Sequence, residues 1–212
     1  MIRALQSSLI ILLFLGCSTG RVSYYLDGDL QTRRFLDHVS NPEKISGDYF
    51  EVKRNDKGQI TSAKYYSLSK RLIYRSNYTY NRKGQLLRHH LTEFFDKGPP
   101  RIAKAWEFKN GRMVKREEKW FTRARTLEKK LTVHYDDLER AYLEETWGLG
   151  NKIASSTEFY YDYKKRLDKS RRNFFNTDGS LRDYWLSIYN DHNRIINDKL
   201  LWFYFCVTII NL

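Results

Sequence analysis

The stretch that decides the fold is Tyr78–Leu86, which reads YTYNRKGQL. Aromatic residues alternate with a polar one, an Asn follows, and a Gly stands three residues after the Asn. An Asx side chain at the first position of a type I turn accepts hydrogen bonds from the backbone ahead, and Gly adopts the left-handed conformation that closes the turn. The stretch therefore predicts a β-strand that ends in a tight turn.

The same phrase returns along the chain, as FYYDYKKRL at Phe159–Leu167 and FFNTDGSL at Phe174–Leu181. Counted from Gly84, equivalent positions recur at steps close to one or two units of about 14 residues, which is the signature of a repeat architecture. Glu139 and Lys165 stand where a Gly is expected, and neither favours the left-handed conformation. The turn residues that we expect are Asn55, Gly58, Asn81, Gly84, Gly98, Gly111, Asp136, Asp162, Asn176, Gly179 and Asn190.

The segments between these turns predict strands, because apolar residues stand two apart and each pair then shares one face. Such pairs are Tyr78/Tyr80, Trp106/Phe108, Val133/Tyr135 and Phe159/Tyr161. The middles are strongly polar, as in KREEK at Lys115–Lys119, which indicates strands that are only partly covered. A unit of about 14 residues holds roughly ten strand residues and a turn, so successive units run antiparallel. We expect an all-β fold, a long antiparallel β-meander that is curved or loosely wrapped.

The segment before the repeats has a different pattern. Over Asp29–Ser40 the apolar residues follow part of a helical face, and Asn41-Pro42 should end a helix. We therefore expect one short N-terminal helix that caps the first strand. Tyr24 and Tyr25 are suited to an additional edge strand.

The N-terminus has the pattern of an export signal. Leu9–Leu15 is apolar but too short to span a bilayer, which needs ~20 apolar residues. It runs into LFLGC at Leu13–Cys17, which resembles the lipobox of bacterial lipoproteins. In that family the Cys carries lipid and the signal is cut just before it, so the resemblance implies lipidation of Cys17. Phe14 stands where an aliphatic residue is usual, which leaves an ordinary signal peptide as the alternative.

The repeated phrases carry a second resemblance. YTYNRKGQL, FYYDYKKRL and VHYDDLERAYL (Val133–Leu143) resemble the YD or RHS-type repeats of bacterial surface proteins and toxins. They are also similar to the MORN-like repeats of small bacterial envelope and antitoxin-like proteins. The resemblance extends loosely over Phe50–Phe203 and implies a β-hairpin scaffold used for enclosure or contact.

The predicted organisation has four parts. A signal peptide occupies residues 1–16, and a lipid-tethered segment with the short helix occupies 17–46. The repeat domain covers 47–203, and an apolar tail covers 204–212. No Asx or Gly follows Phe205 where the next turn should begin, so the tail is either a closing strand or a truncated repeat.

Residues suited to catalysis or metal binding do not cluster in the sequence. His89 and His90 are adjacent on a predicted strand, so they point to opposite faces and do not easily share a metal. The carboxylates of Glu117 and Glu118 are split in the same way. Cys206 lies in an apolar run, which indicates a buried thiol. We therefore expect no catalytic residue, no metal ligand and no cofactor, and we predict that the chain is not an enzyme.

The charge of the chain bears on its partners. The formal net charge of +13 favours anionic partners, although Lys and Arg also solvate exposed strands. Basic residues interleaved with aromatic ones at Tyr160–Phe175 would suit nucleic acid, but the period-two pattern and the export signal favour an ordinary strand pair. Nucleic acid is therefore not expected as a partner.

These observations together predict an exported protein, lipid-anchored to a bacterial membrane on the periplasmic side or at the surface. Its expected partners are the membrane, through the N-terminal lipid, and a protein or an anionic envelope polymer. The predicted function is a non-catalytic scaffold or binding module. The alternatives are a polyanion binder, for glycan, lipid head groups or nucleic acid, and an antitoxin-like or immunity-like protein binder.

Overall fold

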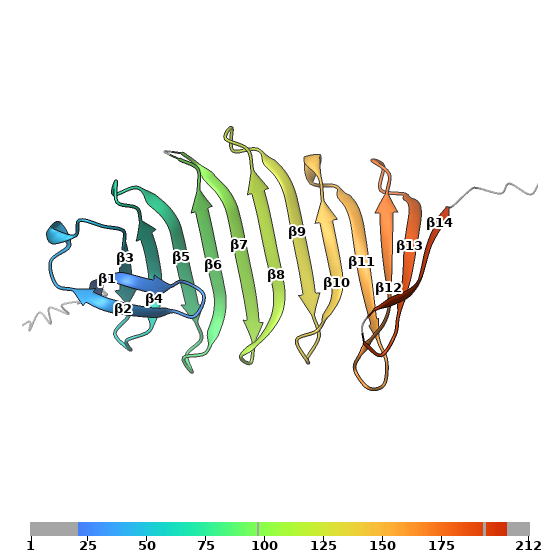
Figure 1. Ribbon diagram of the computed structural model, residues 1–212, viewed down its shortest axis with the longest axis horizontal. Helices are drawn as coiled ribbons and strands as arrows, with labels where there is room; N and C mark the ends of the chain where they lie inside the picture. Colours follow the sequence, from blue (N-terminus) through green and yellow to red (C-terminus); the bar gives the residue numbers. More distant parts are fainter. Residues whose placement is uncertain (1–20, 97, 193, 203–212) are drawn as a thin grey trace, which may run out of the picture.

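The structure, a computed structural model, describes residues 21–96, 98–192 and 194–202. Its strands form one antiparallel sheet of 14 strands, shown in Figure 1. The all-β meander predicted from the sequence is confirmed. Cys17, the expected signal peptide over 1–16 and the tail over 204–212 lie outside the described residues.

Strands β3 to β14 follow one another in chain order across the sheet. Their bounds are β3 (Tyr49–Arg54), β4 (Ile60–Tyr66), β5 (Leu72–Tyr80), β6 (Leu86–Phe94), β7 (Pro100–Lys109), β8 (Arg112–Phe121), β9 (Leu127–Tyr135), β10 (Ala141–Trp147), β11 (Ile153–Tyr161), β12 (Leu167–Phe175), β13 (Leu181–Tyr189) and β14 (Ile195–Trp202). At the other end, β1 (Arg21–Asp29) lies between β3 and the edge strand β2 (Arg34–Val39). Two short 3₁₀ turns, η1 (Pro42–Lys44) and η2 (Leu149–Asn151), complete the described elements.

The short helix expected over Asp29–Ser40 is wrong, because this segment holds the end of β1, a turn and β2. Arg33 in that turn adopts a left-handed φ of 60°. Phe35 then meets Phe50 of β3 edge-on, with ring centroids 5.5 Å apart. Packing of this kind between strands outweighs a weak helical periodicity.

The hairpin turns share one hydrogen-bond pattern. In the turn after β5, the Asn81 N–H donates to the carbonyl of Gln85 at 2.9 Å, and the Gly84 N–H donates to the carbonyl of Asn81 at 3.0 Å. The same pair of bonds closes the turns that begin at Asn55, Ser67, Phe95, Thr122, Asp136, Asp162 and Asn176, with Gly98 as the closing donor to Phe95. One turn geometry therefore repeats at both ends of the strands.

The Asx side chains named from the sequence bind the backbone ahead of them. Backbone N–H groups four residues on donate to Oδ1 of Asn55, Asn81, Asp136, Asp162 and Asn190. Asn176 instead donates from its amide to Ser180 Oγ at 2.9 Å. Left-handed φ angles occur at Gly58, Gly84, Gly111 and Gly179. Glu139 and Lys165 also have positive φ, 60° and 66°, so the turn holds a side chain in that conformation at a steric cost.

Strand register defines two faces, because residues directly opposite one another point to the same side. Tyr78, His89 and Trp106 are register partners on β5, β6 and β7 and belong to one face. Arg88 and Glu107, which pair one residue further along, belong to the other. We call the first the hairpin face, since the β1–β2 hairpin covers part of it, and the second the open face.

The core lies at the N-terminal end, where the β1–β2 hairpin folds over the hairpin face. Figure 1 shows this hairpin crossing in front of β3 and β4. The Tyr78 hydroxyl donates to the backbone oxygen of Leu30 in the hairpin. The buried residues of this core are Phe50, Val52, Ile60, Ala63 and Tyr78. On β5, Ser76 and Tyr78 face the hairpin and are buried, whereas Arg75, Asn77 and Thr79 point to the open face and are exposed.

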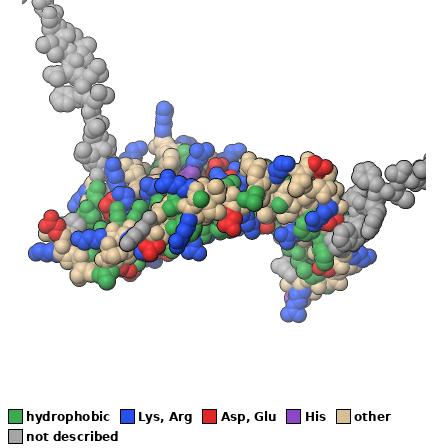
Figure 2. Space-filling model, turned by 90° about the horizontal axis from the view of Figure 1, so that it is seen from above, with side chains coloured by type: hydrophobic (Ala, Val, Ile, Leu, Met, Phe, Trp, Pro, Cys, Tyr) green, Lys and Arg blue, Asp and Glu red, His purple; other side chains and the backbone are tan. Residues whose placement is uncertain are grey.

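The middle of the sheet is a single layer in the described part of the chain. From β7 to β10 most side chains on both faces are half-buried. Figure 2 shows the molecule thickest at its N-terminal end, with the last strands turned out of the plane of the rest. The middle therefore depends on contacts along the sheet rather than on a second layer.

Side chains link some turns that are neighbours on the same side of the sheet. Gln59 Nε2 donates to the carbonyl of Gly84 at 3.0 Å, and Lys152 Nζ donates to the carbonyl of Thr177 at 2.6 Å. Both contacts join residues 25 apart, which is one hairpin along the chain. These four turns are thereby linked in two pairs.

Candidate binding faces of the sheet

Ionisable side chains do not converge into a metal centre in the parts of the chain described. No group of three or more His, Cys, Asp or Glu residues there could hold a metal ion. His89 is buried on the hairpin face and His90 is exposed on the open face, as strand alternation predicted. The carboxylates of Glu117 and Glu118 likewise lie on opposite faces. Among the described residues, no helix is long and apolar enough to cross a bilayer.

An aromatic ladder crosses the hairpin face from the core outward. Tyr78 stacks on His89 and His89 stacks on Trp106, each with ring centroids 4.6 Å apart and planes within 17° of parallel. The three residues are register partners on adjacent strands, which lie ~4.8 Å apart in any sheet, so their rings stack in a row. Tyr78 and His89 are buried, whereas Trp106 is half-buried. The ladder therefore begins in the core and ends on accessible surface.

Burial keeps this ladder uncharged near neutral pH. It lowers the pKa of His89 to about 4, and the positive charges of Arg33 and His90 add to the effect. The His89 ring also has a hydrogen-bond partner, since Ser76 Oγ lies 3.0 Å from His89 Nε2. Burial also raises the pKa of Tyr78 to about 12. Both rings are therefore neutral and present apolar faces to their neighbours.

A cleft of about 440 Å³ opens where the hairpin meets the sheet. It is lined by Gly28, Asp29, Leu30, Gln31, Phe50, Tyr65, Tyr74 and Leu91. Aromatic walls with a few polar groups are typical of ligand sites. The Tyr65 hydroxyl donates to Asp48 at 2.6 Å, and this hydrogen bond, with burial, raises the pKa of Tyr65 to about 12. Leu91 stands opposite Lys104 of β7, so the cleft leads onto the uncovered middle of the face.

Beyond the cleft, the hairpin face combines indole rings with paired charges. Ile102 and Trp120 are register partners there, and the Lys129 ammonium lies 5.3 Å from the centroid of the Trp120 ring. Lys104 stands directly opposite Glu118, with Nζ 3.4 Å from a carboxylate oxygen. The half-buried rings of this region are therefore accessible, and its central charges are neutralised in place.

The open face has a different charge pattern. At register positions from β4 to β12 its basic residues are Lys64, Arg75, Arg88, Lys115, Lys119, Lys130, Lys169 and Arg171. Its acidic residues over the same strands are Glu107, Glu117, Glu145 and Glu158. The open face therefore carries an excess of positive charge that the hairpin face lacks.

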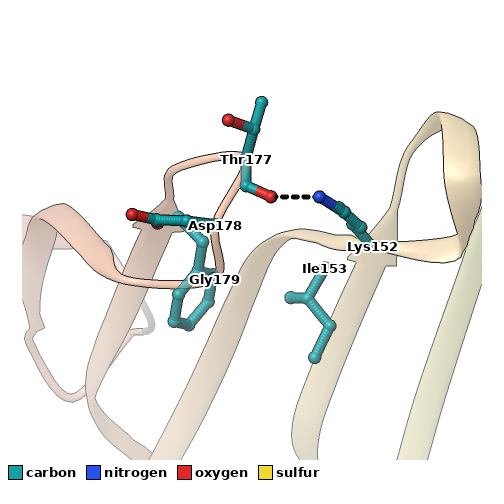
Figure 3. A pocket seen from close by; sticks show the side chains of 6 residues that line it. Lys152, Ile153, Thr177, Asp178 and Gly179 are labelled. Atoms are coloured by element: carbon teal, nitrogen blue, oxygen red, sulfur yellow. Dashed lines mark hydrogen bonds between the residues drawn. The ribbon is translucent and has the colours of Figure 1, made fainter.

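A smaller cavity of about 240 Å³ lies between two turns on one edge of the sheet (Figure 3). The hydrogen bond from Lys152 Nζ to the Thr177 carbonyl joins the two turns beside it. Hydrogen bonds from Ser180 engage the Asp178 carboxylate and lower its pKa. Because these polar groups are already used within the turns, the cavity is a joint between turns and a poor candidate for a ligand site.

The residues of the two faces were only partly visible from the sequence. The sequence predicts Trp106 as a strand residue and Lys119 as part of a polar strand middle, but it assigns no role to Trp120 or Lys130. Alternation within KREEKW does separate Lys119 from Trp120, so that signal was present. Which side the β1–β2 hairpin covers is not visible in the sequence, because the pattern of that segment predicts a helix.

No family model matches the chain, and no curated protein matches its sequence. Among solved structures, a mutant of S. aureus TarM in complex with fondaparinux, α-GlcNAc-glycerol and UDP is 13% identical, with a TM-score of 0.30. That match covers 59% of this chain and 21% of TarM. A protein of unknown function from Bacteroides fragilis is also 13% identical, with a TM-score of 0.20, over 60% of this chain and 91% of its own. Likenesses this weak carry no argument about function.

Proposed function

We propose that the chain is an exported, lipid-anchored and non-catalytic binding module of the bacterial cell envelope, which holds an extended glycan strand on its hairpin face. The observation that supports this is the aromatic ladder, which begins in the core and ends at the half-buried ring of Trp106, with the half-buried ring of Trp120 on the same face. Flat aromatic rings stack on the apolar faces of sugar rings. The cleft of about 440 Å³ beside the ladder would receive one end of such a strand.

A glycan suits this face better than a second protein layer. The core of a protein interface is depleted of charged residues. On the hairpin face the Lys104–Glu118 pair lies among the rings, with the Glu118 side chain only 14% exposed. Sugar hydroxyls can hydrogen bond to such a pair without separating its charges, whereas an apolar partner surface would only desolvate it.

The membrane anchor rests on the LFLGC sequence that ends at Cys17. Metabolic labelling with a fatty-acid analogue should tag the wild-type chain and leave Cys17→Ser untagged. Equal labelling of the two would contradict the anchor and leave secretion as the interpretation.

Co-sedimentation with insoluble polysaccharide from bacterial envelopes tests the ligand. The double substitution Trp106→Ala/Trp120→Ala should weaken binding roughly tenfold, because a stacked ring contributes about 0.5–1.5 kcal/mol beyond its buried area. Trp147→Ala is the matched control, since this ring lies on the open face opposite Lys130. Equal losses from the two variants, or no binding by the wild type, would overturn the proposal.

A further inference from the structure

Two pairs of like-charged residues stand directly opposite one another on the open face. Lys64 faces Arg75 on β4 and β5, and Lys119 faces Lys130 on β8 and β9. The two pairs lie in one row across the sheet. The short side chains of Thr92 on β6 and Ala103 on β7 separate them. Three strand spacings separate the facing members of the pairs, a distance of ~14 Å. Like charges in this position destabilise a sheet, and within the described residues a glutamate pairs with only one member of each pair, so the other member suits an outside source of negative charge.

The hairpin face makes the contrast plain. There Lys104 stands opposite Glu118, and Arg116 also lies 3.5 Å from the Glu118 carboxylate. On the open face Lys64 pairs with Glu51 and Lys119 pairs with Glu117, each at 2.7 Å, but Arg75 and Lys130 make no ion pair within the described residues. They lie instead over the rings of Phe94 and Trp147, at 5.4 and 3.8 Å from the ring centroids.

The Glu117 carboxylate, at the centre of the open face, lies among several lysines. Burial raises the pKa of Glu117, but the hydrogen bond from Lys119 and the charges of Lys119, Lys115 and Lys130 outweigh burial and lower it. Lys119 Nζ lies 2.7 Å from this carboxylate. One negative charge is therefore surrounded by several ammonium groups, and positive charge remains at the surface.

We propose that the open face docks on the anionic phospholipid head groups of the membrane that anchors the chain. The basic residues are spread over a broad face from β4 to β12, which fits an extended charged surface better than a compact ligand. Juxtamembrane basic residues gain free energy from anionic lipid, and a basic surface supplies the second contact that strengthens a lipid anchor.

The length of the N-terminal connection supports the same occupant. Strand β1 begins at Arg21, four residues after Cys17. A fully extended chain of four residues reaches at most ~14 Å, so a lipid on Cys17 would hold the sheet beside the head groups. The inference takes only this tether from the proposed function. With the open face on the membrane, the hairpin face is directed away from it and toward the envelope glycan.

Vesicle co-sedimentation tests the proposal on the full chain carrying Cys17→Ser, so that no lipid can be attached at that residue. The protein should bind phosphatidylcholine vesicles that contain phosphatidylglycerol and should not bind phosphatidylcholine alone. Lys119→Gln/Lys130→Gln should weaken binding more than tenfold, since each cation near an anionic surface contributes about fivefold. Lys104→Gln/Lys129→Gln removes the same charge from the hairpin face and should change binding less than about twofold.

The control is matched residue by residue. Lys119 and Lys104 each pair with a glutamate, and Lys130 and Lys129 each lie over a Trp ring. If thermal melting shows that a double variant is unfolded, the adjacent single substitutions Lys130→Gln and Lys129→Gln give the same comparison.

Three results would overturn the proposal: equal losses from the two double variants, wild-type binding that ignores phosphatidylglycerol, or much tighter binding to heparin than to vesicles. The last would assign the open face to a polymer and not to a membrane. The vesicle assays contain no glycan and Cys17 is replaced throughout, so their outcome can be told apart from the outcomes of the glycan and labelling experiments.

Discussion

The covered N-terminal end of the sheet and its uncovered middle are built from the same strands and turns but bury their side chains differently. On β5 the residues facing the hairpin are largely buried and their neighbours are exposed. On β8 every residue after Arg112 is half-buried. Backbone pairing is antiparallel in both regions. The repeated hairpins therefore supply the sheet, and the β1–β2 hairpin covers its main hydrophobic cluster.

The uncovered middle replaces a second layer with contacts within each row. On the hairpin face Lys129 lies over Trp120, and on the open face Lys130 lies over Trp147. Long basic side chains of this kind cover aromatic surface with their methylene groups and keep their charges in water. Ligands can reach such a surface, which is why both proposed binding faces lie in this region.

Truncation of two isoleucines, one in each region, should give the largest difference in the free energy of unfolding. Ile60 is 5% exposed in the core, whereas Ile102 is half-buried on β7. Ile60→Ala should lower the free energy of unfolding by about 3–4 kcal/mol, and Ile102→Ala by about 1 kcal/mol, because the second site leaves little cavity. Denaturant unfolding measures both values. Similar losses would mean that the middle has a core of its own.

Acid should weaken the covered end through His89. Its pKa is about 4 in the folded chain, against ~6.5 when unfolded, so between these values only the unfolded state binds the proton. Stability should therefore fall as pH drops from 6.5 toward 4, by roughly 2–3 kcal/mol. His89→Gln should flatten this part of the profile, and His90→Gln should preserve it. An unchanged slope in His89→Gln would show that the buried imidazole is not its source.

Turn glycines should cost the same at the covered end and far from the β1–β2 hairpin if only the cover differs. Gly58 precedes β4 with φ +76°, and Gly179 precedes β13 with φ +90°; an added Cβ meets nothing within 4 Å at either. Gly58→Ala and Gly179→Ala should each cost about 1 kcal/mol from backbone strain. Gly47→Ala is the control, since Gly47 is outside the left-handed region and also has open space. Unequal costs, measured by thermal melting, would show that the turns are not equivalent.

The smallest effect should come from the charge pair in the uncovered middle. A double-mutant cycle with Lys104→Met and Glu118→Gln should give a coupling of about 0.5 kcal/mol, because solvent screens the half-exposed lysine. Coupling well above 1 kcal/mol would mean that the middle is drier than its single layer suggests.

The segment Asp29–Ser40 was predicted as a helix from its local pattern, and the structure shows the limit of such a pattern. Asp29 Oδ1 accepts hydrogen bonds from the N–H groups of Gln31 and Thr32, a contact that would suit the first turn of a helix. The chain turns back instead, and Asp37 within β2 has a left-handed φ of 56°. The same side-chain contact serves a helix start and a turn, so the local pattern could not distinguish them.

The turns that begin at an Asx residue were determined by the sequence alone, because the Asx side chain and a left-handed residue act within five residues of each other. The turns that begin at Ser67 and Thr122 have no Asx signal. Tertiary structure decided which surface is core and which binds. The Tyr78–Leu30 hydrogen bond joins residues 48 apart, and no local pattern encodes that contact. A register shift also lies beside the turns, as between Thr79 and Tyr80, and such a shift moves a side chain to the other face. The sequence therefore contains the residues of the aromatic ladder and the basic residues of the open face. Only the pairing of the strands places each set on one face.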